Sequence, residues 1–383
     1  MGNKVKILII AETVMDGVGK HVDDIIEYID KDKFDLVVAH GASRMDYRFK
    51  WIKKKWENEI EFVEIPELKR EIKLSEDLRA VKRIIKVIRR TRPDVVHCHS
   101  SKAGVVGRVA AKLCRVKRVY YTPHAYAVQN PESQTSKYLL YLSIERFLAR
   151  FATTLTINVS KGEKHFAINH NIQKPNHFRV IYNALGPQKS NHPAKVSFDY
   201  IPEGVHVIGC VARIYEQKNP EEFLKIAKEI CERRDDVNFI WVGVGSLYDS
   251  CMALVKEYQL ENKVFFVGHQ VNIPAFLDRF DIFLSTSLYE GLPYTLIESM
   301  QSNCPILASD VIGNNEVIKS GYNGYLYKLG DVREACDKIE LLLDSPSIIS
   351  KMKIASQMRF KELFTIDKMI SQIEMLYYSG EIE

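Results

Sequence analysis

The chain has 383 residues, which is long enough for two domains of ordinary size, each with its own hydrophobic core. Its apolar content of 46% is typical of a globular protein, and no apolar run approaches the roughly 18 to 20 residues that a membrane-spanning helix needs. The seven cysteines are scattered and form no CxxC pair, which indicates reduced core thiols in a cytosolic enzyme.

The net charge of +5 conceals an asymmetry between the two halves of the chain. Up to Gly186 there are 34 Lys and Arg against 21 Asp and Glu, a net charge of +13, whereas the remainder has 20 against 28, a net charge of −8. The first half is therefore basic enough to prefer a polyanion or an anionic membrane surface. No nucleic-acid recognition module is recognisable, so we expect no nucleic acid as a partner.

Buried strands and helices alternate along the first half. Residues 4–11 form an apolar run that ends in a small-residue turn over 12–19, followed by a helical pattern over 20–29. The remaining predicted strands are 35–40, 94–99 and 118–122, and the remaining predicted helices are 75–91, 101–115 and 135–150. Strands alternating with helices predict parallel βαβ units and a doubly wound sheet.

The segment 184–203 interrupts this alternation because it is rich in Pro, Gly and Asn and has weak periodicity. Beyond it the pattern restarts, with predicted strands 206–212, 238–242, 263–266, 281–285 and 305–308, and predicted helices 219–233, 246–258, 294–302 and 331–344. The last forty residues are expected to be helical throughout. The predicted domains are 1–186, a linker 187–203, a second domain 204–365 and a C-terminal helix 366–383.

The resulting fold class is α/β, with two Rossmann-like domains facing each other across a cleft and the C-terminal helix crossing back to the N-terminal domain. In such sheets ligands bind beyond the carboxyl ends of the strands. We therefore search those positions for functional side chains.

The segment YEGLPYTLIESM at 289–300 is the most informative one. Glu290 and Glu298 stand eight residues apart, with Gly291 and Pro293 between them, where a predicted strand has ended and a helix begins. Glu290 is expected in the turn and Glu298 about one turn inside the helix. The backbone N–H groups of a helix N-terminus form an anion site. A phosphate flanked by two carboxylates predicts a ligand with both phosphate and hydroxyl groups, and a nucleotide sugar fits that description.

Two cations, Arg213 and Lys218, follow the predicted strand 206–212 and precede a helix. An Arg fork and a Lys point charge together suit a diphosphate, although a solvated loop would explain the pattern equally well. Gly243 also follows a strand, and so do Val267 and His269, whose backbone we expect near a nucleobase. Ordinary turns are the alternative for both segments.

In the first domain, Gly17 and Gly19 belong to a turn that lacks the third glycine of a dinucleotide fingerprint. His124 lies just past the strand 118–122, at the predicted cleft. His97 and His99 point to the same face of a predicted strand, a spacing compatible with a metal. No second ligand cluster is recognisable, so we interpret them as polar residues at a strand end and expect no metal.

The sequence resembles the family 4 retaining glycosyltransferases of the two-Rossmann-domain (GT-B) type, and in particular the branch that builds bacterial capsular polysaccharide and exopolysaccharide. The resemblance extends over nearly the whole chain. Its specific part is the E-x7-E segment, supported by Arg213, Lys218 and the motifs DGVGKH, VHCHSSKAG, TPHAY and VIYNA. One departure is Asp16, which stands where the family has the first glycine of a GG pair.

The resemblance implies a role for each candidate residue. His124 and Glu290 would act at the transferred sugar. The donor-binding residues would be Gly17, Gly19, Arg213, Lys218, Gly243, Val267, His269, Thr295, Leu296 and Glu298. The donor would be a nucleotide-diphosphate sugar, with UDP favoured by family frequency.

The mechanism implied is sugar transfer with retention at the anomeric carbon. Arg213, Lys218 and the helix N-terminus would stabilise the negative charge of the leaving diphosphate, the preorganised electrostatics that usually contributes most to catalysis. No DxD-like pair follows a strand, so we expect no metal and no cofactor. A covalent role for Glu290 is a less favoured alternative.

The basic half suggests where the acceptor comes from. The stretches 48–56, 79–92 and 137–151 combine cations with aromatic or apolar residues. Ordinary surface helices would explain most of each pattern, but their concentration in one domain favours docking on an anionic membrane leaflet. We therefore expect a cytoplasmic protein, peripherally associated with the inner face of the cell membrane, that acts on a lipid-diphosphate-linked saccharide.

Two alternatives remain. One is another enzyme on the same fold, a nucleotide-sugar epimerase or a phosphorylase. The other is a non-catalytic nucleotide-sugar-binding scaffold in a polysaccharide assembly.

Overall fold

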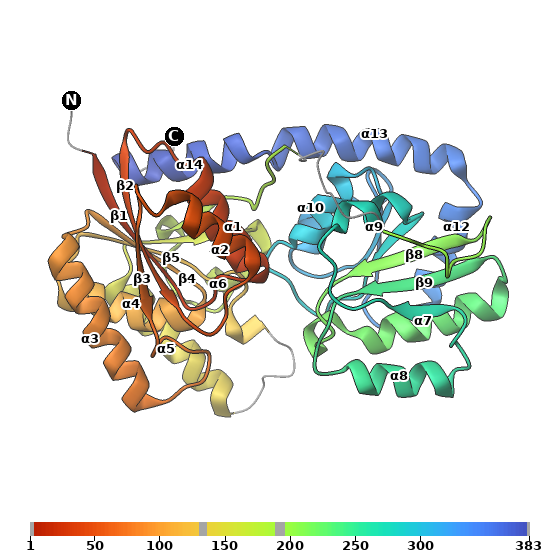
Figure 1. Ribbon diagram of the computed structural model, residues 1–383, viewed down its shortest axis with the longest axis horizontal. Helices are drawn as coiled ribbons and strands as arrows, with labels where there is room; N and C mark the ends of the chain where they lie inside the picture. Colours follow the sequence, from red (N-terminus) through yellow and green to blue (C-terminus); the bar gives the residue numbers. More distant parts are fainter. Residues whose placement is uncertain (1–3, 130–135, 188–195, 381–383) are drawn as a thin grey trace. The chain divides into compact units, whose positions relative to one another are not determined.

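The computed structural model describes residues 4–129, 136–187 and 196–380. The chain divides into two compact units, of which the first comprises Met1–Gly186 with Ile366–Glu383 and the second comprises Pro187–Thr365. Each unit is a parallel α/β sheet flanked by helices (Figure 1). The expected pair of Rossmann-like domains is therefore confirmed. Of the predicted linker 187–203, residues 188–195 lie outside the described residues, and the others are grouped with the second unit.

The first unit contains a seven-stranded sheet in the order β3-β2-β1-β4-β5-β6-β7 within the described residues. In chain order the elements of this unit are β1 (Val5–Ala11), α1 (Asp16–Tyr28), β2 (Phe34–Gly41), α2 (Tyr47–Trp56), β3 (Glu61–Ile65), α3 (Leu74–Thr91), β4 (Val95–His99), α4 (Ser101–Leu113), β5 (Arg118–Thr122), η1 (Ala127–Gln129), α5 (Ser136–Ala152), β6 (Leu155–Asn158), α6 (Lys161–Asn169), η3 (Pro175–His177), β7 (Phe178–Val180) and, from the end of the chain, α14 (Ile366–Ser379).

Two hydrophobic cores cover the two faces of this sheet. Alternate residues of β1 enter different cores, Ile7 and Ile9 on one side and Leu8 and Ile10 on the other, as the two-residue period of a strand requires. The first core is completed by α1, α2 and α14, and the second by α3, α4, α5 and α6 (Figure 1). The predicted return of the C-terminal helix to the N-terminal domain is therefore confirmed.

The second unit contains a six-stranded sheet in the order β10-β9-β8-β11-β12-β13 within the described residues. Its elements are β8 (His206–Val211), η4 (Glu216–Lys218), α7 (Pro220–Arg233), β9 (Val237–Val242), α8 (Tyr248–Glu257), β10 (Val264–Phe266), α9 (Ile273–Arg279), β11 (Ile282–Ser285), α10 (Tyr294–Gln301), β12 (Ile306–Ser309), α11 (Asn314–Val317), β13 (Tyr325–Tyr327), α12 (Val332–Leu343) and α13 (Pro346–Leu363).

The core of the second unit packs α7, α8 and α12 against one face of the sheet, with Phe223, Phe239 and Trp241 in edge-to-face contact. Such aromatic pairs add about 0.5–1.5 kcal/mol each beyond the area they bury. The predicted strands and helices of this half agree with the structure to within two residues at each end. The seven cysteines, all within the described residues, are free thiols.

Two expectations about local structure are wrong. The small-residue turn over 12–19 is shorter than predicted, because α1 already begins at Asp16 and includes Gly17 and Gly19. The C-terminal forty residues are two helices, α13 and α14, separated at Phe364 and Thr365. No helix in the described residues is long and apolar enough to cross a membrane.

Candidate functional site

The order of strands in the second unit reverses between β8 and β11. The strands that follow β8 in sequence, β9 and β10, extend the sheet on one side, whereas β11, β12 and β13 extend it on the other. The connections that leave the carboxyl ends of β8 and β11 therefore run in opposite directions, and doubly wound sheets bind ligands at such a switch point. Arg213 and Lys218 follow β8, and Glu290 follows β11, so all three residues lie on loops that leave the sheet at this switch point.

The side chains of Lys218 and Glu290 form an ion pair there. Both groups are mostly buried, with 18% of the Lys218 side chain and 8% of the Glu290 side chain exposed. The sequence placed both in the donor site without predicting that they touch. In a partly desolvated position each charge is held by the other, and losing one partner would leave the other uncompensated.

Backbone contacts between the two loops fix this pair in place. Gln217 donates from Nε2 to the carbonyl oxygen of Tyr289 (3.0 Å) and accepts at its own carbonyl from the N–H of Leu288 (2.8 Å). The hydroxyl of Thr286 donates to the carbonyl oxygens of Lys218 and Asn219, both at 2.9 Å. These bonds join the β8 and β11 loops into one structure, although the sequence alone gave no sign of them.

The helix α10 begins at Tyr294, directly after the β11 loop. Thr295 and Leu296 lie in its first turn and Glu298 is its fifth residue, as the spacing of the E-x7-E segment predicts. Glu298 is partly exposed and Leu296 is buried. The loop before the helix is crowded: at Gly313, where φ is +89°, a Cβ atom would lie 2.7 Å from the carbonyl oxygen of Gly291.

Three further predicted donor residues lie on neighbouring loops of the same sheet edge. Gly243 donates its N–H to the carbonyl oxygen of Gly268 (2.8 Å), which joins the loops after β9 and β10 next to Val267. His269, one residue further on, is exposed. The guanidinium of Arg213 lies 5.1 Å from the centre of the Tyr215 ring, within cation–π range.

In the first unit the strand order reverses between β1 and β4. Asp16 follows β1 and has φ of +55°, a left-handed conformation that favours glycine and that short polar residues tolerate. Gly19 lies in the first turn of α1, where a Cβ atom would lie 2.5 Å from the carbonyl carbon of Val14. Gly19 therefore lets the helix approach the β1 loop closely. Gly17 lies in the same turn of α1, and not in the turn before the helix where we expected it.

Four histidines gather at the carboxyl edge of this sheet. The rings of His21, on α1, and His124, after β5, are 4.7 Å apart between centroids. His99, at the end of β4, has Nδ1 at 3.2 Å from Nε2 of His124. The rings of His97 and His99 lie 4.0 Å apart between centroids, tilted by 41°, on the same face of β4 as predicted. The nitrogens of His97 contact the hydroxyls of Tyr377 (2.7 Å) and Thr122 (2.8 Å).

Burial keeps these imidazoles neutral. It lowers the pKa of His21 to about 4, although the hydrogen bond to Asn183 opposes the shift, and it lowers the pKa of His97 to about 3. The pKa values of His99 and His124 lie well below the usual value, first because of burial and then because neighbouring histidines disfavour a second positive charge. Neutral imidazoles can accept a hydrogen bond or bind a metal, but they cannot supply a cation.

The turn that carries His124 has an unusual backbone. His124 and Ala125 are consecutive residues with positive φ, +54° and +76°. The buried carboxylate of Glu163 accepts the N–H of Ala125 (2.6 Å) and the N–H of Val159 (2.9 Å), so β6 and α6 hold the turn. Left-handed non-glycine residues persist only where their surroundings impose them, and they are concentrated at functional sites.

Sequence reasoning missed three residues of these two clusters: His21, Asn183 and Gln217. The signals were present, because His21 ends the motif DGVGKH and Asn183 belongs to VIYNA. Only the fold shows that these positions, 162 residues apart in sequence, share a hydrogen bond of 3.1 Å between His21 Nδ1 and Asn183 Oδ1.

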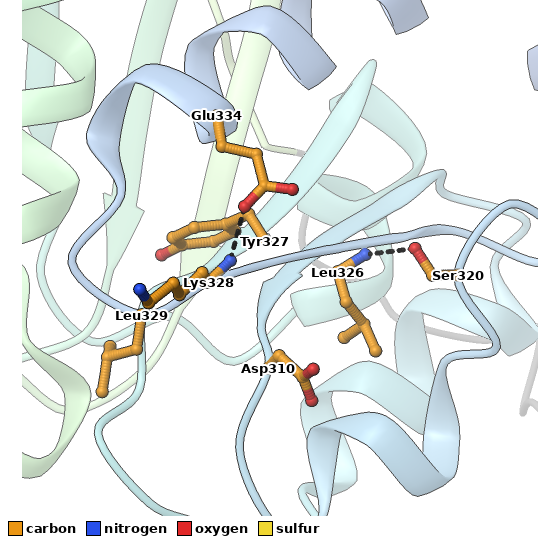
Figure 2. A pocket seen from close by; sticks show the side chains of 7 residues that line it. All are labelled: Asp310, Ser320, Leu326, Tyr327, Lys328, Leu329 and Glu334. Carbon is orange, nitrogen blue, oxygen red and sulfur yellow. Dashed lines mark hydrogen bonds between the residues drawn. The ribbon is translucent and has the colours of Figure 1, made fainter.

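A separate pocket of about 500 Å³ lies beyond β12 and β13 (Figure 2). Glu334 on α12 accepts the N–H of Lys328 (2.8 Å), and Ser320 accepts the N–H of Leu326 (3.1 Å). Asp310 and Tyr327 also line it, but none of the predicted donor residues does. This pocket therefore does not coincide with the predicted donor residues.

The fold and the site define the class. Residues 15–189 match the model of Glycosyltransferase Family 4, and residues 195–359 match the model of Glycosyl transferases group 1, so the two models cover nearly all of 15–359. The chain belongs to the family 4 glycosyltransferases, with the GT-B fold.

Individual relatives agree with that assignment. The chain is 29% identical over 324 residues to the UDP-Gal:alpha-D-GlcNAc-diphosphoundecaprenol alpha-1,3-galactosyltransferase of Escherichia coli, covering 82% of each chain. It is 24% identical to the capsular polysaccharide biosynthesis glycosyltransferase CapM of Staphylococcus aureus, covering 92% of each. Among solved structures, Anabaena Alr3699/HepE in complex with UDP and glucose superposes with a TM-score of 0.80 at 20% identity, covering 98% of this chain and all of that one.

Proposed function

We propose that this glycosyltransferase moves a sugar from a nucleotide-diphosphate sugar, with UDP as the nucleotide, to a lipid-diphosphate-linked saccharide during capsular polysaccharide or exopolysaccharide synthesis. The observation that carries the donor half is the Lys218–Glu290 pair at the β8/β11 switch point. The acceptor half is supported by the name of the Escherichia coli relative and by the surface of the first unit.

In the proposed reaction the two members of the Lys218–Glu290 ion pair contact different parts of the donor. Lys218 and Arg213 would contact the diphosphate, Glu290 the transferred sugar, and Glu298 the ribose hydroxyls. The bond between the anomeric carbon and the diphosphate oxygen breaks, and the acceptor hydroxyl attacks from the same face, so that configuration is retained. The acceptor proton passes to the departing phosphate oxygen. His124, as a neutral imidazole, would contact the sugar.

We further propose that transfer needs no metal ion, because Lys218, Arg213 and the first turn of α10 supply positive potential for the leaving diphosphate. Removing one such group typically costs about 10²- to 10³-fold in kcat. A loss of that size in Lys218→Ala, with EDTA leaving the wild type unaffected, is the expected result.

The test begins with a thermal-shift screen of UDP-, GDP- and dTDP-sugars, followed by transfer to a polyprenyl-diphosphate-linked saccharide. We expect UDP-sugars to give the largest shift, and Lys218→Ala and Glu298→Ala to abolish it. The matched control is Lys225→Ala on α7, whose ammonium forms an exposed ion pair with Glu221. Donor binding that survives in both site variants would overturn the assignment.

The same assay separates the alternatives. A phosphorylase would release nucleotide or sugar phosphate only with inorganic phosphate, and an epimerase would change the sugar without releasing nucleotide. A scaffold would bind the donor without turnover on any acceptor. Nucleotide release that requires an acceptor alcohol, and gives an α-linked product from an α-linked donor, supports retaining transfer.

We also propose that α5 docks the first unit on the inner, anionic face of the cell membrane. Leu139, Leu140, Phe147 and Phe151 are 57–66% exposed, and Phe147 and Phe151 lie in contact with 5.0 Å between ring centroids. The first unit carries 35 Lys and Arg against 25 Asp and Glu, which favours an anionic surface.

Vesicle flotation tests the docking. The protein should float with phosphatidylglycerol vesicles but not with phosphatidylcholine vesicles, and salt should weaken binding because it screens the attraction. The double substitution Phe147→Ser and Phe151→Ser should weaken it at least tenfold. Leu113→Ser, at an equally exposed apolar residue on α4, is the control. Equal loss in both variants would contradict the assignment to α5.

A further inference from the structure

We propose that His21, His99 and His124 form a binding site for a divalent transition metal ion of the zinc class in the first unit. One possible ligand nitrogen from each residue lies within 4.8 Å of those of the other two. In a tetrahedral zinc site with Zn–N bonds of about 2.0–2.1 Å the nitrogens stand roughly 3.4 Å apart. Small rotations of the three imidazoles therefore suffice to close them around one ion.

The first proposed ligand, His21, is held in position by a hydrogen bond at its Nδ1. An amide oxygen only accepts hydrogen bonds, so the 3.1 Å contact requires His21 Nδ1 to donate to Asn183 Oδ1. That bond fixes the tautomer and leaves the lone pair on Nε2. Asn183 is itself buried, with 3% exposed. Metal-binding histidines almost always have such a carbonyl or carboxylate partner behind them.

The second ligand has a nitrogen that the protein does not satisfy. His99 is fully buried, and its Nε2 has no hydrogen-bond partner among the described residues. Its Nδ1 lies 3.2 Å from Nε2 of His124, and in the tautomer in which Nδ1 donates this hydrogen bond, Nε2 of His99 carries the lone pair that a metal would bind. His97, by contrast, has both nitrogens engaged by hydroxyl groups. This difference singles out His99 as a ligand and excludes its neighbour.

The third ligand provides the route of entry. Part of the surface of His124 is exposed, whereas His21 and His99 are buried. It sits on the left-handed turn that Glu163 holds through the N–H of Ala125. Three imidazoles without a carboxylate favour Zn²⁺, Cu²⁺, Ni²⁺ or Co²⁺ over Mg²⁺ or Ca²⁺, which prefer oxygen ligands. They also leave a fourth position for water.

Binding has a consequence that rests on the proposed function. The ion would take the lone pair of His124, the residue that we propose contacts the transferred sugar. Loading the site should therefore slow sugar transfer, while the metal-free protein stays active. Metal binding itself is measured without donor or acceptor, so a failure of the proposed sugar transfer would not affect that measurement.

The experiment uses the full chain stripped with EDTA and titrated with Co²⁺ and then Zn²⁺. We expect one equivalent of Co²⁺ with the strong visible absorption of a tetrahedral site, and displacement of Co²⁺ by Zn²⁺. X-ray absorption of the zinc form should show nitrogen ligands at about 2.0–2.1 Å. His99→Gln should weaken binding at least tenfold, and Asn183→Ala by about 10- to 100-fold through loss of the supporting hydrogen bond.

The control is His165→Gln, which removes an exposed histidine of α6 and should leave affinity unchanged. Circular dichroism establishes that each variant is folded. If His99→Gln does not fold, the metal affinity of Asn183→Ala and the Co²⁺ absorption spectrum of the wild type test the proposal instead. Unchanged affinity in folded His99→Gln, or a zinc shell made only of oxygen ligands, would overturn the proposal.

Discussion

Replacing Glu163 by Gln tests whether its carboxylate holds the turn that carries His124. Glu163 has no exposed surface, and its two oxygens accept three hydrogen bonds, from the N–H of Ala125 (2.6 Å), the N–H of Val159 (2.9 Å) and Nδ2 of Asn158 (3.1 Å). Gln has the same shape but one acceptor oxygen. Whichever way its amide turns, a buried backbone N–H loses its acceptor and faces an NH₂ group.

The structure gives the size of the effect. A hydrogen bond to a charged group contributes about 1.5–3 kcal/mol, and an unsatisfied buried donor adds a cost of its own. We therefore expect Glu163→Gln to lower the free energy of unfolding of the first unit by about 2–4 kcal/mol. At roughly 2–4 °C per kcal/mol for a unit of this size, the melting temperature should fall by about 5–15 °C.

Differential scanning calorimetry of the full chain measures this shift, and sugar transfer well below the transition measures the effect on His124. Glu64→Gln, an exposed carboxylate on β3, is the matched control and should change the melting temperature by less than about 1 °C. A Glu163→Gln shift no larger than that of the control would refute the reasoning. A large shift with unchanged transfer would show that the turn matters for stability alone.

Three further predictions concern single contacts. Gly243→Ala should destabilise the second unit strongly and abolish donor binding, because Gly243 has φ of +146° and a Cβ atom there would lie 2.0 Å from the carbonyl oxygen of Ala212. Chemical denaturation measures the loss of stability, and the thermal shift with donor measures the loss of binding. Asp23→Asn should stabilise the protein increasingly as pH rises from 4 to 8. Burial raises the pKa of Asp23 to about 8, although Arg48 lies 3.2 Å away. Between pH 4 and 8 the native carboxyl therefore keeps a proton that the unfolded chain has lost, and the free energy of unfolding of the wild type falls by up to about 1.4 kcal/mol per pH unit. Equal stability of both proteins across that range would contradict this. Tyr377→Phe should cost about 1–3 kcal/mol by leaving the buried His97 nitrogen without its partner, and an unchanged urea midpoint would argue that water replaces the hydroxyl.

Strongly apolar strands and amphipathic helices were predictable from the sequence because burial on both faces of a parallel sheet imposes a simple pattern. The strands that were missed are short or lie toward the sheet edges. β3, with the sequence EFVEI, is the edge strand of its sheet and carries two glutamates. Charged residues on an edge strand prevent pairing with other chains, but they also interrupt the apolar run by which a buried strand is recognised. The start of α1 was misplaced because Asp16-Gly17-Val-Gly19 has the composition of a turn, although Gly19 serves close packing against the β1 loop.

Most of the proposed donor residues could be grouped from the sequence because they follow strands, and the carboxyl ends of parallel strands meet at one edge of a sheet. What the sequence could not show is which of them touch, as with the ion pair between Lys218 and Glu290. The histidine cluster was beyond reach for another reason. His21, His99 and His124 come from three different strand–helix connections, so no spacing in the sequence reveals them as neighbours.

The helix α14 makes the first unit discontinuous in sequence. Its residues Ile370, Ile373 and Leu376 belong to the same core as β1, and 179 residues separate it from Gly186, where the rest of that unit ends. During synthesis at about 5–20 residues per second, one face of the N-terminal sheet therefore waits roughly 10–40 s for its covering helix. The whole second unit is therefore synthesised before the helix that completes the core of the first unit.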